Sequence, residues 1–172
     1  MKQKSIVFIT IFVLVCILIF LVFSQSSEEF YKENDTDVVN EESKAVISIN
    51  CKTIQSNYER LEEGLKDRDY IPRDGIILPE TTVEIHEGDT VLEVLKRVTK
   101  KNKIHLEYTQ SPNDSYVEGI NHIYEFSCGE LSGWMFKVNG VFANKGCNSY
   151  KVKNGDVIEW VYTCNLGKDI GA

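Results

Sequence analysis

The cysteines are the residues of this sequence whose type and spacing most directly suggest chemistry. Beyond an apolar N-terminal run there are four of them: Cys51, Cys128, Cys147 and Cys164. In a domain outside the cell, an even number of cysteines is typical of a disulfide framework, and four allow three pairings. Zinc is the competing use, but no two of the four have a CxxC spacing and no histidine is close enough in sequence to complete a site. We therefore expect disulfides.

The remaining polar residues give no enzyme signature. His86, His105 and His122 could ligate a metal or act as bases, but their scattered positions are typical of solvated surface residues. The segment 129–133, GELSG, lacks both the G-x-S-x-G spacing and the strand-to-helix setting of a nucleophile elbow. No phosphate-binding loop, dinucleotide fingerprint or metal motif occurs. We predict that the chain is not an enzyme and uses no metal or cofactor.

Aromatic residues are dense near the C-terminus and suggest a binding surface. Large aromatics dominate small cores, so a central pair such as Trp160 and Tyr162 is expected to be structural. Three others border predicted loops and turns, where a ligand could reach them. These candidates are Trp134, Phe142 and Tyr150.

The elements that position these residues follow from periodicity. Alternating apolar residues predict strands at 46–51, 81–86, 104–108, 123–128 and 134–138, and the strongest strand at 157–163. Turns are expected at Asn139-Gly140 and at 154–156, with loops at 67–80 and 111–121. A weak surface helix is expected at 57–66. Thr90 and Glu93 form a capping box that begins a helix running to about Asn102.

One helix among several strands predicts an α+β fold with one sheet face on the helix. The simplest architecture with this order is a β-grasp-like mixed sheet, in which the first and last strands are central neighbours. Those strands end at Cys51 and Cys164, so we expect these two to pair, which leaves Cys128 with Cys147.

The N-terminal residues predict a membrane anchor. Residues 6–23 are an uncharged apolar run of 18, nearer the roughly 20 residues of a spanning helix than the roughly 7 to 15 of a signal-peptide core. Lys2 and Lys4 precede the run and acids follow it, so the N-terminus should stay inside the cell and the rest outside. Cleavage after the run stays open because Ser24 and Ser26 are small; the domain would then be secreted.

The charge is acidic, with 19 Lys and Arg against 26 Asp and Glu, which argues against a nucleic-acid partner. Much of the acidity lies in residues 24–44, which contain few apolar side chains. Such a composition cannot bury enough surface to fold. We therefore expect a membrane anchor or signal sequence over 1–23, a flexible acidic stalk over 24–44 and a folded domain over 45–172.

Four blocks of the folded part carry a resemblance to a known family. They are SINCKTI at 48–54, EGDTVLEVLKRV at 87–98, ELSGWMFKVNG at 130–140 and KNGDVIEWVYTCNLGKDIG at 153–171. From Val46 to Gly171 the chain resembles the bacterial transcobalamin-like C-terminal domain family, a family of unknown function. That family is similar to the small β-domain of the cobalamin carriers, which implies a β-grasp fold of the soluble-ligand-binding kind.

The resemblance also implies a ligand surface. In the carriers the small domain contacts cobalamin through positions that correspond to 120–123 and 134–138, so the implied contacts here are Asn121, Trp134 and Phe136. The large helical barrel of the carriers is absent from this chain. Two hypotheses follow: a module that binds a corrinoid or another small flat ligand outside the membrane, or a module that engages a cell-envelope protein through the open sheet face.

Overall fold

The computed structural model describes residues 16–19, 43–66, 70–111 and 115–172. The chain divides into two units, Met1–Glu41 and Glu42–Ala172. The predicted anchor over 1–23 and stalk over 24–44 therefore lie almost entirely outside the described residues. Within the described ranges, no helix has the length and apolar character needed to cross a membrane.

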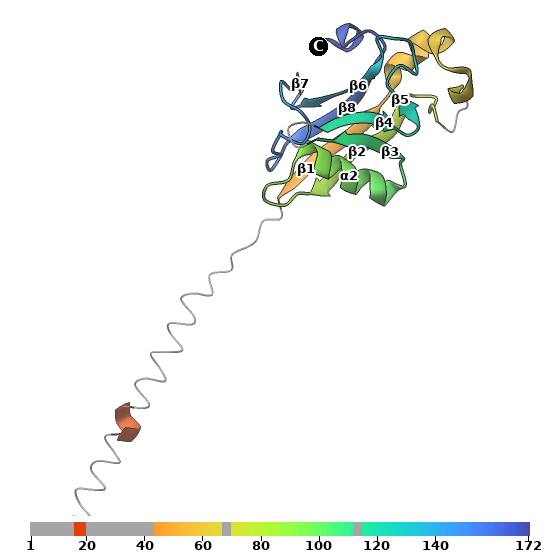
Figure 1. Ribbon diagram of the computed structural model, residues 1–172. Coiled ribbons are helices and arrows are strands. Elements are labelled where there is room, and N and C mark those ends of the chain that lie inside the picture. The colour runs from red at the N-terminus through yellow and green to blue at the C-terminus, as the bar shows by residue number, and fades with distance from the viewer. Residues whose placement is uncertain (1–15, 20–42, 67–69, 112–114) are drawn as a thin grey trace, which may run out of the picture. The chain divides into compact units, whose positions relative to one another are not determined.

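The larger unit is built on a five-stranded sheet with the strand order β2-β1-β8-β6-β7 (Figure 1). Its strands are β1 (Lys44–Asn50), β2 (Ile76–Glu84), β6 (Gly133–Val138), β7 (Val141–Phe142) and β8 (Val157–Thr163). The first and last strands, β1 and β8, are parallel neighbours in the middle of the order, with Ile47 beside Ile158 and Ile49 beside Trp160. This adjacency and the α+β class are confirmed.

The edge strand β2 begins earlier than predicted and passes through Pro79. Proline has no N–H to give to a ladder, but an edge strand tolerates it at an irregularity. Here the partners of Ile47 and Ile49 on β2 are Thr81 and Leu78, so β2 carries one extra residue at this point. The resulting bulge interrupts the alternation of inward and outward residues, so periodicity does not predict the first part of β2.

A second sheet has the order β3-β4-β5 and consists of β3 (Leu106–Gln110), β4 (Ser115–Ile120) and β5 (Ile123–Tyr124). The prediction of a loop over 111–121 is wrong, because residues 115–120 pair with β3 along their whole length. The prediction of a strand over 123–128 is too long by four residues. β4 contains Gly119, where a larger residue would not fit, because a Cβ at this position would come within 2.7 Å of the Tyr124 ring.

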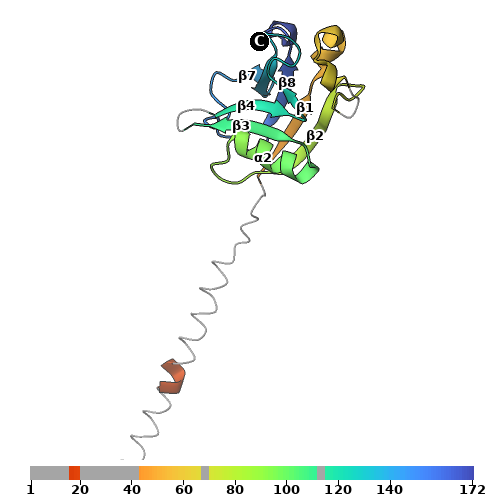
Figure 2. The same ribbon diagram turned by 45° about the vertical axis from the view of Figure 1, so that its right-hand side comes forward.

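The helix α2 (Val91–Asn102) supplies much of the core (Figure 2). The Thr90 half of its predicted capping box is confirmed: the N–H of Glu93 donates to Thr90 Oγ1 at 3.2 Å. Its buried face is Val91, Leu92, Val94, Leu95 and Val98, which belong to the same core as the inward residues of β1 and β8.

Three 3₁₀ helices complete the described elements: η1 (Lys52–Arg60), η2 (Glu63–Leu65) and η3 (Lys168–Ile170). η1 and η2 replace the predicted surface helix at 57–66. The predicted hairpin turn between β6 and β7 is confirmed, with Asn139 and Gly140 at φ 54° and 77°, the pair of positive values that a tight two-residue hairpin requires.

Candidate functional site

The turn between β4 and β5 is the most unusual backbone of the described domain. Its two residues, Asn121 and His122, have φ values of 53° and 64°. Two consecutive positive values match a two-residue hairpin turn, which normally takes glycine. Asparagine and histidine adopt this region more often than most residues, but any residue with a Cβ has a steric cost there that the surrounding contacts must offset. Such residues cluster at functional sites.

Three hydrogen bonds hold this 121–122 turn. The N–H of Asn121 donates to the His105 carbonyl at 2.8 Å, and its side-chain Nδ2 donates to the Tyr70 carbonyl at 2.9 Å. From beneath, Trp134 Nε1 donates to the carbonyl of Ile123 at 2.7 Å. The turn is therefore anchored to β6 and to the segments before β2 and β3.

The anchored turn places His122 in a ring cluster. The imidazoles of His122 and His105 are stacked with centroids 4.3 Å apart and planes 18° apart. Tyr70 meets His122 edge-on at 5.0 Å. His122 is exposed, whereas Nδ1 of His105 is buried and has no hydrogen-bond partner among the described residues. A buried polar atom without a partner is costly, and such atoms often mark functional positions.

Two phenols, one on β4 and one on β5, are hydrogen-bonded to carboxylates, and the second of them borders the histidine cluster. Tyr124 lies 5.9 Å from His105, and its hydroxyl donates to Glu107 Oε2 at 2.8 Å. That hydrogen bond, with burial, raises the pKa of Tyr124. Burial, followed by the hydrogen bond to Glu125, raises the pKa of Tyr116 to about 12. Both phenols therefore stay protonated at neutral pH and remain hydrogen-bond donors.

The other predicted ligand-facing residues are more buried than expected. Trp134 is 6% exposed and lies beneath the turn, where it packs edge-on against Tyr162 at 5.2 Å. Phe136 is half-buried against Trp160 at 5.2 Å. On the opposite face of the sheet, Lys137 Nζ lies 4.7 Å from the centroid of Phe142. The structure thus brings Trp134 and Asn121 to one turn and leaves Phe142 apart from it.

Tyr150, the fifth predicted contact, lines a groove of about 490 Å³ elsewhere on the domain. The groove is rich in lysine, and Tyr150 also meets Phe136 edge-on at 6.1 Å. The full lining is Asn139, Asn144, Lys145, Ser149, Tyr150, Lys151, Lys153 and Asp156.

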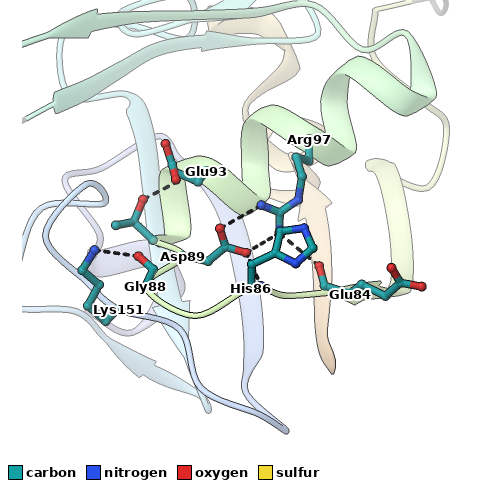
Figure 3. A network of polar contacts seen from close by, with 8 residues as sticks. Glu84, His86, Gly88, Asp89, Glu93, Arg97 and Lys151 are labelled. Carbon is teal, nitrogen blue, oxygen red and sulfur yellow. Dashed lines mark hydrogen bonds and ion pairs between the residues drawn. The ribbon is translucent and has the colours of Figure 1, made fainter. Parts of the chain in front are cut away.

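A second groove, of about 480 Å³, lies between β2 and α2 and is bordered by a paired polar network (Figure 3). Arg97 donates through Nη1 and Nη2 to the two oxygens of Asp89 at 2.9 and 2.6 Å, and also to the Glu84 carbonyl at 3.0 Å. The N–H of His86 donates to Asp89 at 2.7 Å. Burial alone would raise the pKa of Asp89, but these hydrogen bonds outweigh it and lower the pKa. The network ties the end of β2 to α2 and serves stability.

The cysteines do not lie as predicted. Cys51, Cys128 and Cys164 are thiols in this structure, so the Cys128–Cys147 pairing stays a prediction, whereas the strand register argues against Cys51–Cys164. The register pairs Asn50 with Val161, so Cys164 lies two residues further along than Cys51. With about 3.3 Å per residue along a strand and about 4.8 Å between strands, their Cα atoms are about 8 Å apart, beyond the usual reach of a disulfide. Adjacent strands were predicted correctly, but the register was not.

Sequence reasoning did not single out His105, His122 and Tyr70 as site residues. Their sequence positions predict separate solvated histidines, because 17 positions separate His105 from His122. The available signal was the position of His122 beside Asn121, because two polar residues between apolar Ile120 and Ile123 are typical of a hairpin turn. In the described ranges, no three His, Cys, Asp or Glu side chains are grouped to hold a metal ion.

Comparison with known proteins finds a family match for the segment that contains most of this site. Residues 88–164 match the domain of unknown function DUF4430. The match is to a domain of unknown function, as the sequence predicted, and it covers less than half of the chain. The DUF4430 segment includes α2, the 121–122 turn, Trp134 and three of the cysteines. No curated protein matches the chain.

Two solved structures are similar to the chain at low identity. One is haptocorrin in complex with Cbi, at 16% identity and a TM-score of 0.48, over 73% of this chain and 26% of haptocorrin. The other, from Ruminococcus gnavus ATCC 29149, is provisionally described as a metal binding protein, at 11% identity and a TM-score of 0.41 over 71% of this chain and 97% of that one. The chain thus spans about a quarter of haptocorrin, and neither likeness extends to function.

Proposed function

We propose that the DUF4430 domain is a binding module for a small flat ligand, and that its contact surface is the 121–122 turn with Tyr70, His105 and Tyr124. One observation carries the proposal: an exposed His122 imidazole is stacked on a second imidazole and held on a strained, three-way anchored turn. A solvated surface histidine needs no such support. Rigid placement of a few polar groups on an aromatic surface is what small-ligand sites require.

The chemistry of the cluster favours a corrinoid as the ligand. Imidazole nitrogen is a common metal ligand, and a corrinoid presents an axial cobalt position in a flat macrocycle. His122 would approach the cobalt, and Tyr70 and Tyr124 would contact the ring or its amide side chains. The family resemblance of the sequence points to the same ligand class, and Asn121 and Trp134 act in this account by holding the turn.

The composition of the N-terminal residues supports the further proposal that this module lies outside the cell. An apolar anchor over 6–23 and an acidic stalk over 24–44 would hold the domain clear of an anionic membrane surface. The module would then meet its ligand outside the membrane.

Titration of the full chain with aquocobalamin tests the proposal. Aquocobalamin exchanges its axial water for imidazole with a change in visible absorption. We expect that change with the unaltered chain, and we expect it to be lost in His122→Ala. His86→Ala is the matched control, because His86 is also exposed but lies outside the ring cluster.

Two outcomes would count against the proposal. If His122→Ala gave the same absorption change as the unaltered chain, the 121–122 turn would not be the contact surface. If aquocobalamin neither changes its absorption with the unaltered chain nor quenches the tryptophan fluorescence of that chain, a corrinoid is not the ligand. That result would favour the alternative, a cell-envelope protein engaged through the open sheet face.

A further inference from the structure

Two of the four cysteines of the folded unit lie side by side, in a combination that strand order did not predict. Cys128 and Cys164 are 0% and 1% exposed, and Cys128 is among the neighbours that raise the pKa of Cys164. Cys128 follows the short strand β5, whereas Cys164 follows β8 directly. A contact between them links the turn-bearing small sheet to the central strand of the large one.

The surrounding contacts hold both thiols against η1. Cys128 Sγ donates to the Asn57 carbonyl at 3.4 Å, and Cys164 Sγ donates to Thr53 Oγ1 at 3.7 Å. Thr53 and Asn57 are themselves joined, with Asn57 Nδ2 donating to the Thr53 carbonyl at 2.9 Å. Both sulfur atoms therefore face neighbouring positions on one short helix.

The backbone at Cys128 is also tied to β8. The N–H of Cys128 donates to Ser132 Oγ at 3.0 Å, and the hydroxyl of Tyr162 contacts the same oxygen at 3.0 Å. Tyr162 lies two residues before Cys164. These links bring the two cysteines together through geometry that does not depend on the thiols themselves.

From this geometry we infer that Cys128 and Cys164 form a disulfide when the chain folds under oxidising conditions. The inference is independent of the proposed ligand. A low-molecular-weight or protein disulfide, RSSR, is the oxidant: one thiolate attacks it and releases RSH, and the second thiolate then attacks the mixed disulfide and releases another RSH. Two cysteine thiols are oxidised to one S–S bond, and one RSSR is reduced to two RSH.

Burial decides when this reaction occurs. Burial raises the pKa of Cys164 to about 12 although the hydrogen bond with Thr53 opposes it, so little of the Cys164 thiol is ionised in the folded state at neutral pH. Thiolate is the reactive form. The bond therefore forms before η1 closes over the two sulfurs, and afterwards it is shielded from reductants.

Peptide mapping tests the pairing without any substitution, because trypsin places each of these cysteines on its own peptide. From the positions of Lys and Arg, the four peptides are 45–52, 104–137, 146–151 and 154–168. The full chain is refolded with oxidised glutathione, thiols are blocked at acidic pH, and the digest is analysed by mass spectrometry without reduction. We expect peptide 104–137 joined to 154–168.

Every other map overturns the inference. A link between 45–52 and 154–168 would restore the pairing predicted from strand order, and a link between 104–137 and 146–151 would do the same for the second pair. Absence of any link after refolding would show that the contact stays reduced. Cys51→Ser provides a second check, because the 104–137 to 154–168 link should persist when Cys51 is absent.

Discussion

The indole Nε1 of Trp134 donates a 2.7 Å hydrogen bond to the carbonyl oxygen of Ile123, the residue that follows the 121–122 turn. This contact connects a residue predicted to touch ligand with the turn that presents His122. It gives Trp134 a positioning role, since the indole is buried beneath the turn.

Replacing Trp134 with phenylalanine should therefore weaken the domain and the turn together. The substitution leaves the Ile123 carbonyl unsatisfied, which costs about 1–3 kcal/mol of unfolding free energy in addition to lost packing. Trp160→Phe is a matched control, because Trp160 is also buried but its Nε1 has no hydrogen-bond partner among the described residues. Urea unfolding should show a larger loss for Trp134→Phe. Equal losses of stability in the two variants would show that the Trp134–Ile123 hydrogen bond does not contribute to the free energy of unfolding.

Gly119→Ala should disturb the same region by steric contact. The added Cβ would lie 2.7 Å from two atoms of the Tyr124 ring, which in turn contacts His105. Overpacking of this kind costs about 1–3 kcal/mol, and we expect weaker corrinoid binding as the ring moves. Gly64→Ala meets no atom within 4 Å and should change stability by less than about 0.5 kcal/mol. If Gly119→Ala matched Gly64→Ala in stability and in corrinoid affinity, the close packing of the Tyr124 ring against Gly119 would be contradicted.

The ion pair between Asp89 and Arg97 predicts a specific acid sensitivity. The pKa of Asp89 is lowered in the folded state, so its contribution is fully present above the unfolded value of about 4 and is lost as pH falls through the folded value. Arg97 is partly exposed, so we expect Asp89→Asn to cost only about 1–2 kcal/mol at pH 7.

The measurement is the urea midpoint of the unaltered chain and of Asp89→Asn between pH 7 and pH 3. The difference between them should shrink below about pH 4, whereas Glu87→Gln, on the same exposed turn, should differ little from the unaltered chain at any pH. A difference that stays constant or grows on acidification would contradict the lowered pKa.

Oxidation of Cys128 and Cys164 should raise stability because it closes a loop of residues 128–164. Loop-closure entropy for a span of this length corresponds to about 4 kcal/mol. Refolded chain with and without the disulfide should therefore differ in urea midpoint, and Cys164→Ser should match the reduced form. Identical midpoints for oxidised and reduced chain would show that the bond does not constrain the unfolded state as expected.

Local signals in the sequence predicted the scaffold well. The capping residues Thr90 and Glu93 and the alternation of 157–163 each act within a few residues, and both elements were predicted with nearly the observed bounds. β4 was missed because its polar residues and Gly119 are typical of loops, and its identity as a strand comes from pairing with β3. Tertiary pairing outweighed local propensity there.

The candidate site was predicted only in part, for a related reason. Asn121 and Trp134 were identified through the family resemblance, and the structure joins them at one turn. The stacking of His105 on His122 depends on how β3 and β4 pair, which no short-range pattern reveals. The offset between Cys51 and Cys164 was missed for a similar reason, because a shift of two residues in the parallel register of β1 and β8 is invisible to strand prediction.

Binding of a flat ligand at the 121–122 turn can be followed by NMR of the full chain with labelled histidine side chains. Aquocobalamin is diamagnetic, so its addition can be followed at each imidazole. We expect the His122 and His105 resonances to shift together in a saturable manner while those of His86 stay in place. Saturable binding that leaves both His122 and His105 unshifted would contradict it.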